Sequence, residues 1–149
     1  MPPQATERKS GPQTTTFTWR WGPSVLGELD VPSGFTADTW NYREGILTTL
    51  KYRDGSSIVL QKGFMYRIPM FQDPEYILDS SEKDSTKIVR KGHHKGKTEV
   101  WSEVDYLSPM KTPDRSILGA VGPNLGYEHV PRKLGKEFAG ALLSFRPPQ

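Results

Sequence analysis

Cysteine is absent from the 149 residues, so disulfide bonds, thiolate metal sites and a cysteine nucleophile are excluded. Long apolar runs are absent too: none approaches the ~18 residues of a membrane-spanning helix, and we expect no membrane span. The first ten residues lack the apolar segment of a signal peptide. With the lack of cysteine, this irregular start predicts an exported protein, periplasmic or extracellular, whose signal peptide is missing. A cytoplasmic location is the alternative.

The excess of one sign of charge over the other is also small. Twenty Lys and Arg face 17 Asp and Glu, which gives a formal charge of +3. This near balance permits acidic partners without requiring them. Four Trp, six Tyr and six Phe supply large side chains for a core, which disordered chains lack.

The domain organisation follows from a change in composition. Residues 1–16 are rich in Pro, Gln, Thr and charge, which predicts a disordered tail. Residues 17–146 are then one domain. Within it, Phe17–Trp21 alternates apolar and polar residues as a half-buried strand does. Val25–Val31 is expected to be a second strand, interrupted by glycine.

A hairpin is expected in the next segment. Residues 46–52 and 57–61 flank Asp54-Gly55, and Asp-Gly between β-rich runs is a strong hairpin signal of the type I′ turn. Further strands are expected around 64–68 and 76–78.

A second hairpin is expected after a polar, turn-like stretch at 80–85. Its strands are 86–91 and 97–106, joined by the glycine-flanked turn 92–96. Several prolines then predict a long surface loop over 107–123.

The C-terminal region carries the clearest local pattern. Residues 124–130 are predicted to form a strand, and Pro131 opens a helix that ends before Pro147. The apolar positions of this helix fall on one face: Leu134, Phe138, Ala141, Leu142 and Phe145. We therefore predict an α+β fold, a single curved antiparallel sheet built of hairpins with the C-terminal amphipathic helix packed on one face.

Several segments together resemble small exported bacterial proteins of unknown function. The resemblance covers about residues 30–146. Its motifs are Asp54-Gly55-Ser56 with Ile58, Gly63 and Met65 before Ile68-Pro69, Trp101-Ser102-Glu103, Tyr127 to Pro131, Phe138, and Ser144-Phe145-Arg146. At fold level it implies an α+β sandwich like that of Mog1 and PsbP. It implies no activity.

The histidines are the first candidates for chemistry. His93 and His94 are adjacent in the predicted turn, and a metal site would need the third histidine, His129, with a carboxylate such as Glu99. Adjacent residues of a strand point to opposite faces, and adjacent turn residues rarely chelate together. We therefore expect solvated turn histidines, no metal and no cofactor.

A basic run surrounds the same turn and offers a second candidate. Trp101 nearby could stack on a base, but acidic residues lie close by and exposed lysines commonly protect sheet edges. Nucleic acid is therefore not the expected partner. The basic residues are Lys87, Arg90, Lys91, Lys95 and Lys97.

Catalytic motifs are lacking. No Gly-x-Ser-x-Gly elbow occurs, and the sequence Gly119–Asn124 lacks the Lys of a phosphate loop. Glu99, Glu103 and Asp105 share one face of the predicted strand. They are an acid/base row or, as we prefer, a solvated face.

These observations predict a small soluble, exported binding or accessory domain rather than an enzyme, with a protein or cell-envelope component as partner. Two alternatives stay open: a hydrolase that uses His129 with nearby carboxylates, and a binder of anionic polymers or nucleic acid through the hairpin 86–97. The candidate ligand-binding residues are Trp101, His129, Lys91, His93, His94 and Lys95.

Overall fold

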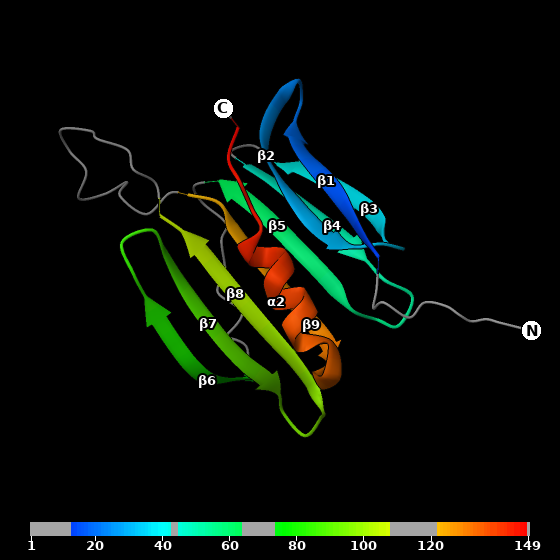
Figure 1. Ribbon diagram of the computed structural model, residues 1–149, viewed down its shortest axis with the longest axis vertical. Coiled ribbons are helices and arrows are strands. Elements are labelled where there is room, and N and C mark those ends of the chain that lie inside the picture. The colour runs from blue at the N-terminus through cyan, green and yellow to red at the C-terminus, as the bar shows by residue number, and fades with distance from the viewer. Residues whose placement is uncertain (1–12, 43–44, 64–73, 108–121, 149) are drawn as a thin grey trace, which may run out of the picture.

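The computed structural model describes residues 13–42, 45–63, 74–107 and 122–148. This part of the chain forms nine strands, a 3-10 turn and one α-helix (Figure 1). In chain order they are β1 (Thr14–Trp21), β2 (Ser24–Pro32), β3 (Thr36–Tyr42), β4 (Gly45–Lys51), β5 (Ser57–Gly63), β6 (Tyr76–Lys83), β7 (Lys87–His94), β8 (Glu99–Tyr106), β9 (Asn124–Pro131), η3 (Arg132–Leu134) and α2 (Gly135–Leu143).

The strands form two antiparallel sheets. β1 and β2 make a two-stranded sheet, and the other seven follow the order β3-β4-β5-β9-β8-β7-β6. The predicted α+β class with antiparallel pairing is confirmed. The expectation of a single sheet built of hairpins needs correction. β1 and β2 form a separate sheet, and in the large sheet β9 inserts between two three-stranded meanders and pairs with β5 and β8.

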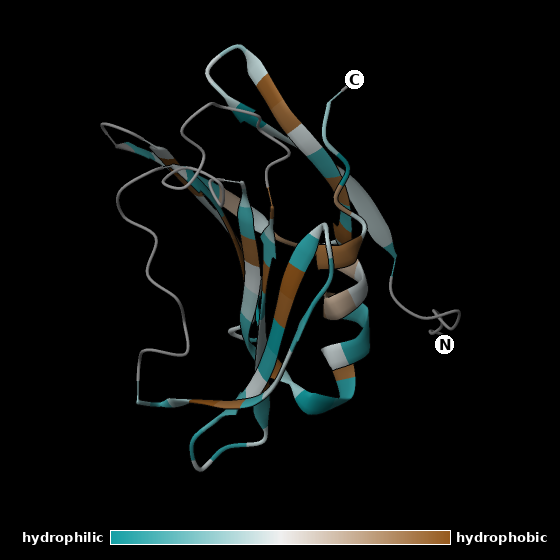
Figure 2. Cartoon of the chain, turned by 90° about the vertical axis from the view of Figure 1, so that its left-hand side faces the viewer, coloured by the Kyte–Doolittle hydropathy of each residue, from teal (hydrophilic) through white to brown (hydrophobic). Residues whose placement is uncertain are grey.

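The helix and the small sheet cover the same face of the large, curved sheet (Figures 1 and 2). The core lies between these two layers, since the apolar faces of strands and helix must be removed from water together. Its buried members are Trp19, Leu29, Val31, Ile46, Leu50, Ile58, Leu60, Val104, Leu125, Tyr127, Val130, Phe138, Ala141 and Leu142.

The C-terminal helix has the predicted apolar face. Phe138, Ala141 and Leu142 are buried, and Leu134 and Phe145 pack partly buried against the core. The helix begins later than predicted, at Gly135, because the three residues after Pro131 form the 3-10 turn. No helix in the described ranges has the length and apolarity to cross a membrane.

The segment after the helix is tied to β2. The backbone N–H of Arg146 donates to the carbonyl of Glu28 and the reverse bond also forms, each 2.9 Å long. The Arg146 guanidinium lies 3.1 Å from the Asp30 carboxylate, and this hydrogen bond lowers the pKa of Asp30. Ser144 Oγ accepts from the Asp30 N–H at 2.8 Å. The C-terminal segment is thereby held beside the small sheet.

Strand boundaries differ from prediction mainly at sheet edges. β3 was not predicted, because its mixed polar sequence is that of an exposed edge strand. β6 continues through residues 80–83, which the sequence assigned to a turn. β1 starts at Thr14, inside the predicted tail, whose residues 1–12 lie outside the described ranges. The strand expected at 64–68 and most of the loop expected at 107–123 also lie outside them.

The hairpin between β4 and β5 is confirmed, but its turn is not the expected type I′. Of its two central residues only Gly55 has positive φ, +97°. The turn is closed by Tyr52 N–H donating to the Ser56 carbonyl at 2.9 Å. The Asp54 carboxylate accepts from the Ser56 N–H, also at 2.9 Å.

Replacing this glycine is expected to destabilise the protein. Gly55→Val places a β-branched residue at positive φ, which costs about 1–3 kcal/mol of unfolding free energy. Gly55→Asn is the matched control, since Asn tolerates this backbone region far better. Urea denaturation of both variants measures the difference, and equal midpoints for Val and Asn would contradict the assigned strain.

Candidate functional sites

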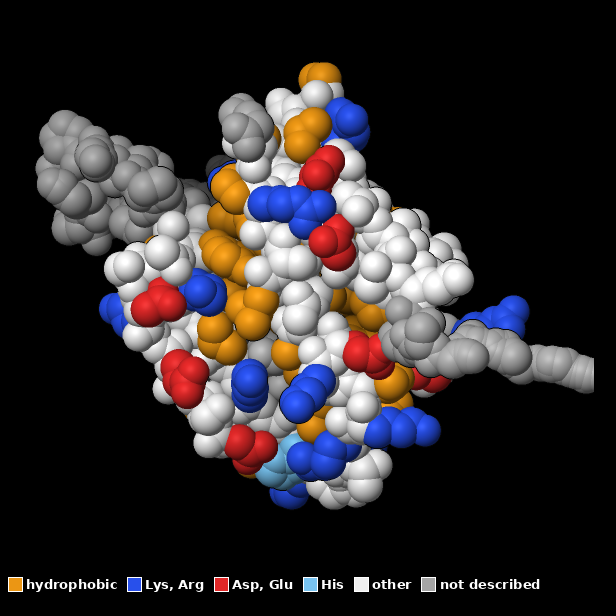
Figure 3. Space-filling model, viewed as in Figure 1, with side chains coloured by type: hydrophobic (Ala, Val, Ile, Leu, Met, Phe, Trp, Pro, Cys, Tyr) orange, Lys and Arg blue, Asp and Glu red, His pale blue; other side chains and the backbone are white. Residues whose placement is uncertain are grey.

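The first candidate site is a cavity of about 530 Å³ between the small sheet, the end of β8 and the C-terminal segment. Most of its walls are apolar, and the lining comes from segments far apart in sequence. The lining residues are Val25, Leu26, Lys62, Thr86, Tyr106, Leu107, Gly122, Pro123, Phe145, Pro147 and Pro148. Figure 3 shows hydrophobic side chains gathered over β8 and the C-terminal segment on this face of the molecule.

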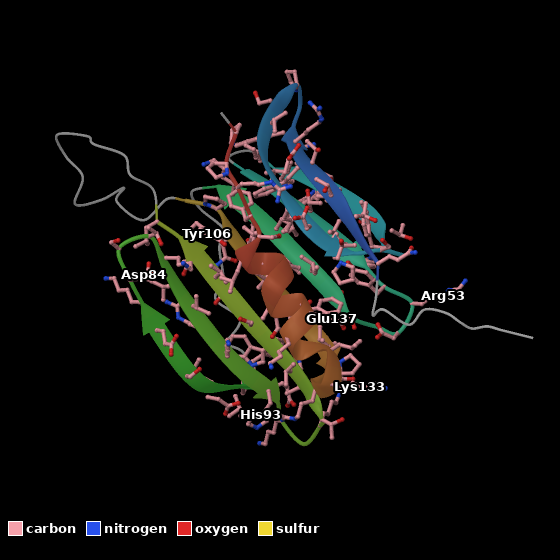
Figure 4. The ribbon with its side chains drawn as sticks, viewed as in Figure 1. Arg53, Asp84, His93, Tyr106, Lys133 and Glu137 are labelled. Atoms are coloured by element: carbon pink, nitrogen blue, oxygen red, sulfur yellow. The ribbon has the colours of Figure 1, made fainter. Side chains whose placement is uncertain are left out.

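Tyr106 forms a fixed wall of this cavity. It ends β8 beside the C-terminal segment (Figure 4). Its ring packs on Phe145 with centroids 5.2 Å apart, and its hydroxyl donates to the Leu142 carbonyl at 2.7 Å. Burial raises the pKa of Tyr106 to about 12, so the phenol is neutral at physiological pH.

Lys62 is the one charged residue among the described residues that line the cavity. It lies near the end of β5, directly opposite Ile46 of β4. Residues opposite each other in an antiparallel pair project to the same face, and Ile46 belongs to the core. Lys62 therefore stands on the face that carries the cavity.

The second candidate site is a cluster of His94, Glu99 and His129, whose ligand atoms lie within 4.8 Å of one another. It sits at the other end of the sheet from the cavity, because Glu99 begins β8 whereas Tyr106 ends it. Figure 4 places His93, the neighbour of His94, far from Tyr106.

An irregularity in the β8–β9 pairing aims His129 into this cluster. Val100 pairs with Val130 and Ser102 with Tyr127, so Trp101 alone faces two residues of β9. His129 is one of these two, and its φ is +58°. Bulges re-aim side chains, and positive φ at a residue other than glycine costs free energy. The backbone of His129 thus has a conformation that a regular strand does not use, and this conformation directs its imidazole into the cluster.

Hydrogen bonds fix the cluster. The His129 backbone N–H donates to His94 Nε2 at 2.9 Å, and His129 Nδ1 lies 3.0 Å from Glu99 Oε1. The two imidazole rings are stacked, with centroids 4.2 Å apart and 8° between their planes. His94 is only 2% exposed. Burial, and after it the charge of His129, lowers the pKa of His94. The hydrogen bond from His129 lowers the pKa of Glu99. At neutral pH the cluster therefore offers a neutral imidazole and a carboxylate.

Tyr76 borders the cluster from β6. Its ring lies against His94 with centroids 4.6 Å apart, and its hydroxyl donates to the Glu128 carboxylate at 2.5 Å. This bond engages the carboxylate next to His129 in sequence, whereas the Glu99 carboxylate is hydrogen-bonded to the His129 ring itself.

The predicted turn histidines occupy the end of β7 instead. This corrects the expectation of a solvated turn: strand alternation separates the two, and His94 is buried in the cluster. His93 points to the other face, where its Nδ1 lies 2.9 Å from the Asp79 carboxylate. The two adjacent rings therefore do not share one site.

Trp101 is buried completely and is not presented to solvent. Its Nε1 donates to the Ile77 carbonyl at 3.2 Å, across Gly92 of β7. This placement makes the indole part of the packing behind the histidine cluster rather than an open stacking surface.

The basic hairpin is partly neutralised by its acidic neighbours. Lys87 lies 3.4 Å from Asp84, and Arg90 lies 2.9 Å from Asp105. Glu103 is fully buried, 3.7 Å from Arg90, so the expectation of a solvated acidic face is wrong at this position. Lys91 and Lys95 are exposed, Lys91 on β7 and Lys95 in the turn that follows.

The cavity residues were not singled out from sequence as a site. Phe145 could have been recognised as a buried or wall residue, since it lay on the predicted apolar face of the helix. No sequence pattern marked Lys62 or Tyr106 as a site residue, because only the arrangement of β5, β8 and the C-terminal segment brings them to one cavity.

No protein-family model, curated protein or solved structure matches this chain.

Proposed function

We propose that this protein is a small binding domain whose ligand is an amphiphile with an apolar body and one negative charge. The observation that carries the proposal is the cavity of about 530 Å³ with apolar walls and Lys62 in its lining. Ligand pockets commonly measure about 300–1,000 Å³ and combine apolar walls with a few polar groups.

The apolar walls supply affinity. The rings of Tyr106 and Phe145 contact each other, and the hydroxyl of Tyr106 is already bonded to the helix carbonyl of Leu142. The wall therefore needs no polar partner from a ligand at this point. Each methylene buried against such a surface contributes about 0.8 kcal/mol.

Lys62 supplies selectivity. An ammonium group beside an apolar cavity attracts an anion more strongly than it would in open solvent, because the surrounding dielectric is lower. A ligand carboxylate that meets it gains a charge-assisted hydrogen bond. A neutral ligand of the same shape gains nothing from Lys62.

The two alternative functions find less support. A hydrolase using His129 has Glu99 in place at 3.0 Å, but the Ser56 hydroxyl donates to the His129 carbonyl at 3.5 Å rather than to its ring. An anionic-polymer site has Lys87 and Arg90 paired with acidic residues. A binding domain therefore agrees best with the geometry.

Export is part of the proposal. The resemblance to small exported bacterial proteins and the absence of cysteine support a place outside the cytoplasm. The ligand is then an amphiphile of the cell envelope. Fractionation of cells that express the native gene checks this location independently of ligand binding.

A pair of ligands tests the role of Lys62. Displacement of the fluorescent anion 1-anilinonaphthalene-8-sulfonate measures the affinities of dodecanoate and of neutral dodecanol. Lys62→Met should weaken dodecanoate binding about tenfold or more, the loss of one charge-assisted hydrogen bond of about 1.5–3 kcal/mol. Dodecanol binding should be unchanged.

Lys133→Met is the matched control, because Lys133 is an exposed lysine of η3 away from the cavity lining (Figure 4). It should leave both affinities unchanged. Failure of dodecanoate to displace the probe, or equal loss of dodecanoate affinity in both lysine variants, would overturn the proposal.

A further inference from the structure

The cluster of His94, Glu99 and His129 has the donor set of a transition-metal site. Two imidazole nitrogens and one carboxylate oxygen suit Zn²⁺, whereas Ca²⁺ and Mg²⁺ prefer oxygen ligands throughout. The three donors come from three different strands, the end of β7, the start of β8 and the irregular part of β9. A bound ion would therefore tie three neighbouring strands together.

The spacing of the donors is close to what such an ion needs. Metal–ligand distances of about 2.0–2.2 Å place the ligands of a tetrahedral ion about 3.4 Å apart. The donor atoms here lie within 4.8 Å of one another. An inward movement of about an ångström or more by side chains is required.

The side chains that must move have room to do so. His94 is 2% exposed, so most of the movement falls to its two partners. The side chains of His129 and Glu99 are 40% and 36% exposed. Because the two rings are stacked, the His129 ring must turn from the stack for both imidazoles to direct lone pairs at one ion.

The backbone favours a role beyond packing. His129 has φ +58°, a strained conformation for a residue other than glycine and one that is often found at functional sites. Histidine is among the residues that tolerate positive φ best after glycine, and a bulge is a place where a side chain is re-aimed. The His94 Nε2 lone pair accepts the hydrogen bond from the His129 backbone N–H, so a metal ion bound through the His94 ring would have to replace this hydrogen bond.

We propose that His94, Glu99 and His129 bind one divalent transition-metal ion of the Zn²⁺ class, with a fourth position open to water. Three protein ligands and an open position are the arrangement of catalytic rather than closed structural zinc sites. This site is separate from the cavity, since the two lie at opposite ends of β8. The metal-site proposal can therefore be tested independently of the amphiphile-binding function.

Zinc titration of the tag-free, EDTA-treated chain tests the site. Isothermal titration calorimetry should show one Zn²⁺ per chain with micromolar or tighter affinity. Co²⁺ substituted at the site should give the visible absorption of a tetrahedral ion. Glu99→Gln and His129→Gln should each weaken Zn²⁺ binding at least tenfold.

His93→Gln is the matched control, because His93 is adjacent in sequence to His94 but faces Asp79 on the other side of the sheet. It should bind Zn²⁺ like the parent chain. His94→Gln removes a buried side chain, so the partly exposed positions 99 and 129 carry the test, and circular dichroism confirms that their variants fold. No heat and no Co²⁺ spectrum at 1 mM metal, or equal losses in His93→Gln and His129→Gln, would overturn the proposal.

Discussion

Gly92→Ala is expected to unfold the protein or to lower its unfolding free energy by at least about 3 kcal/mol, the upper end of the usual cost of overpacking. A Cβ at this position would stand 1.9 Å from the Ile77 carbonyl oxygen and 2.6 Å from Trp101 Nε1. Neither the carbonyl oxygen nor the indole can move away without breaking other contacts. The carbonyl belongs to the strand next to β7, and the indole donates its hydrogen bond to that same carbonyl.

Gly140→Ala provides the comparison. Gly140 is an exposed helical glycine, and a Cβ there meets no atom within 4 Å. Alanine in a helix interior is more stable than glycine by about 0.5–1 kcal/mol, so this variant should gain stability. Urea denaturation of both variants gives the difference, with expression and circular dichroism reporting whether Gly92→Ala folds. A loss below about 0.5 kcal/mol for Gly92→Ala would contradict the close packing of Trp101 on β7.

Phe138→Ala should cost about 3–5 kcal/mol, because a buried aromatic ring leaves a cavity that its surroundings fill only partly. Phe138 is 3% exposed, and its ring packs edge-on against Tyr52 and Tyr127 with centroids 5.3 and 5.8 Å away. Tyr52 lies in the turn that follows β4, and Tyr127 lies in β9 of the large sheet. The variant therefore measures how strongly α2 is docked on the sheet.

Lys136→Ala is the control on the exposed side of the same helix. It should change the unfolding free energy by less than about half a kcal/mol. Thermal or urea denaturation of the two variants should show widely separated midpoints. Coincident midpoints would mean that the helix is not held through Phe138.

Local patterns made part of this fold predictable. The spacing of Phe138, Ala141 and Leu142 predicted the buried helix face, and Asp54-Gly55 predicted the hairpin. Both depend on residues within a few positions of one another. The turn type was predicted wrongly because Asp54 keeps negative φ within a longer turn.

Long-range pairing made the rest unpredictable. The buried Glu103 is compensated by Arg90, which stands opposite it across β7 and β8 in a register that no local pattern reveals. Ligand chemistry grouped His93, His94, His129 and Glu99 as one conceivable metal site that was not expected to form, and nothing in the sequence distinguished His93 from His94. The glycine before them carried a usable signal, since glycine within a strand often marks the close approach of another group. Here that group is the Trp101 indole.

The central place of β9 bears on how the chain folds. β3-β4-β5 and β6-β7-β8 are each meanders of neighbouring segments, and both can pair soon after they are synthesised. Their inner strands, β5 and β8, keep open edges until residues 124–131 arrive to join them. Closure then depends on contacts between β5 and β9, which residues 64–123 separate in the chain. Such non-local contacts slow folding, and open edges meanwhile invite pairing with other chains. We therefore expect the facing edges of β5 and β8 to be protected from pairing with other chains only once β9 has joined them.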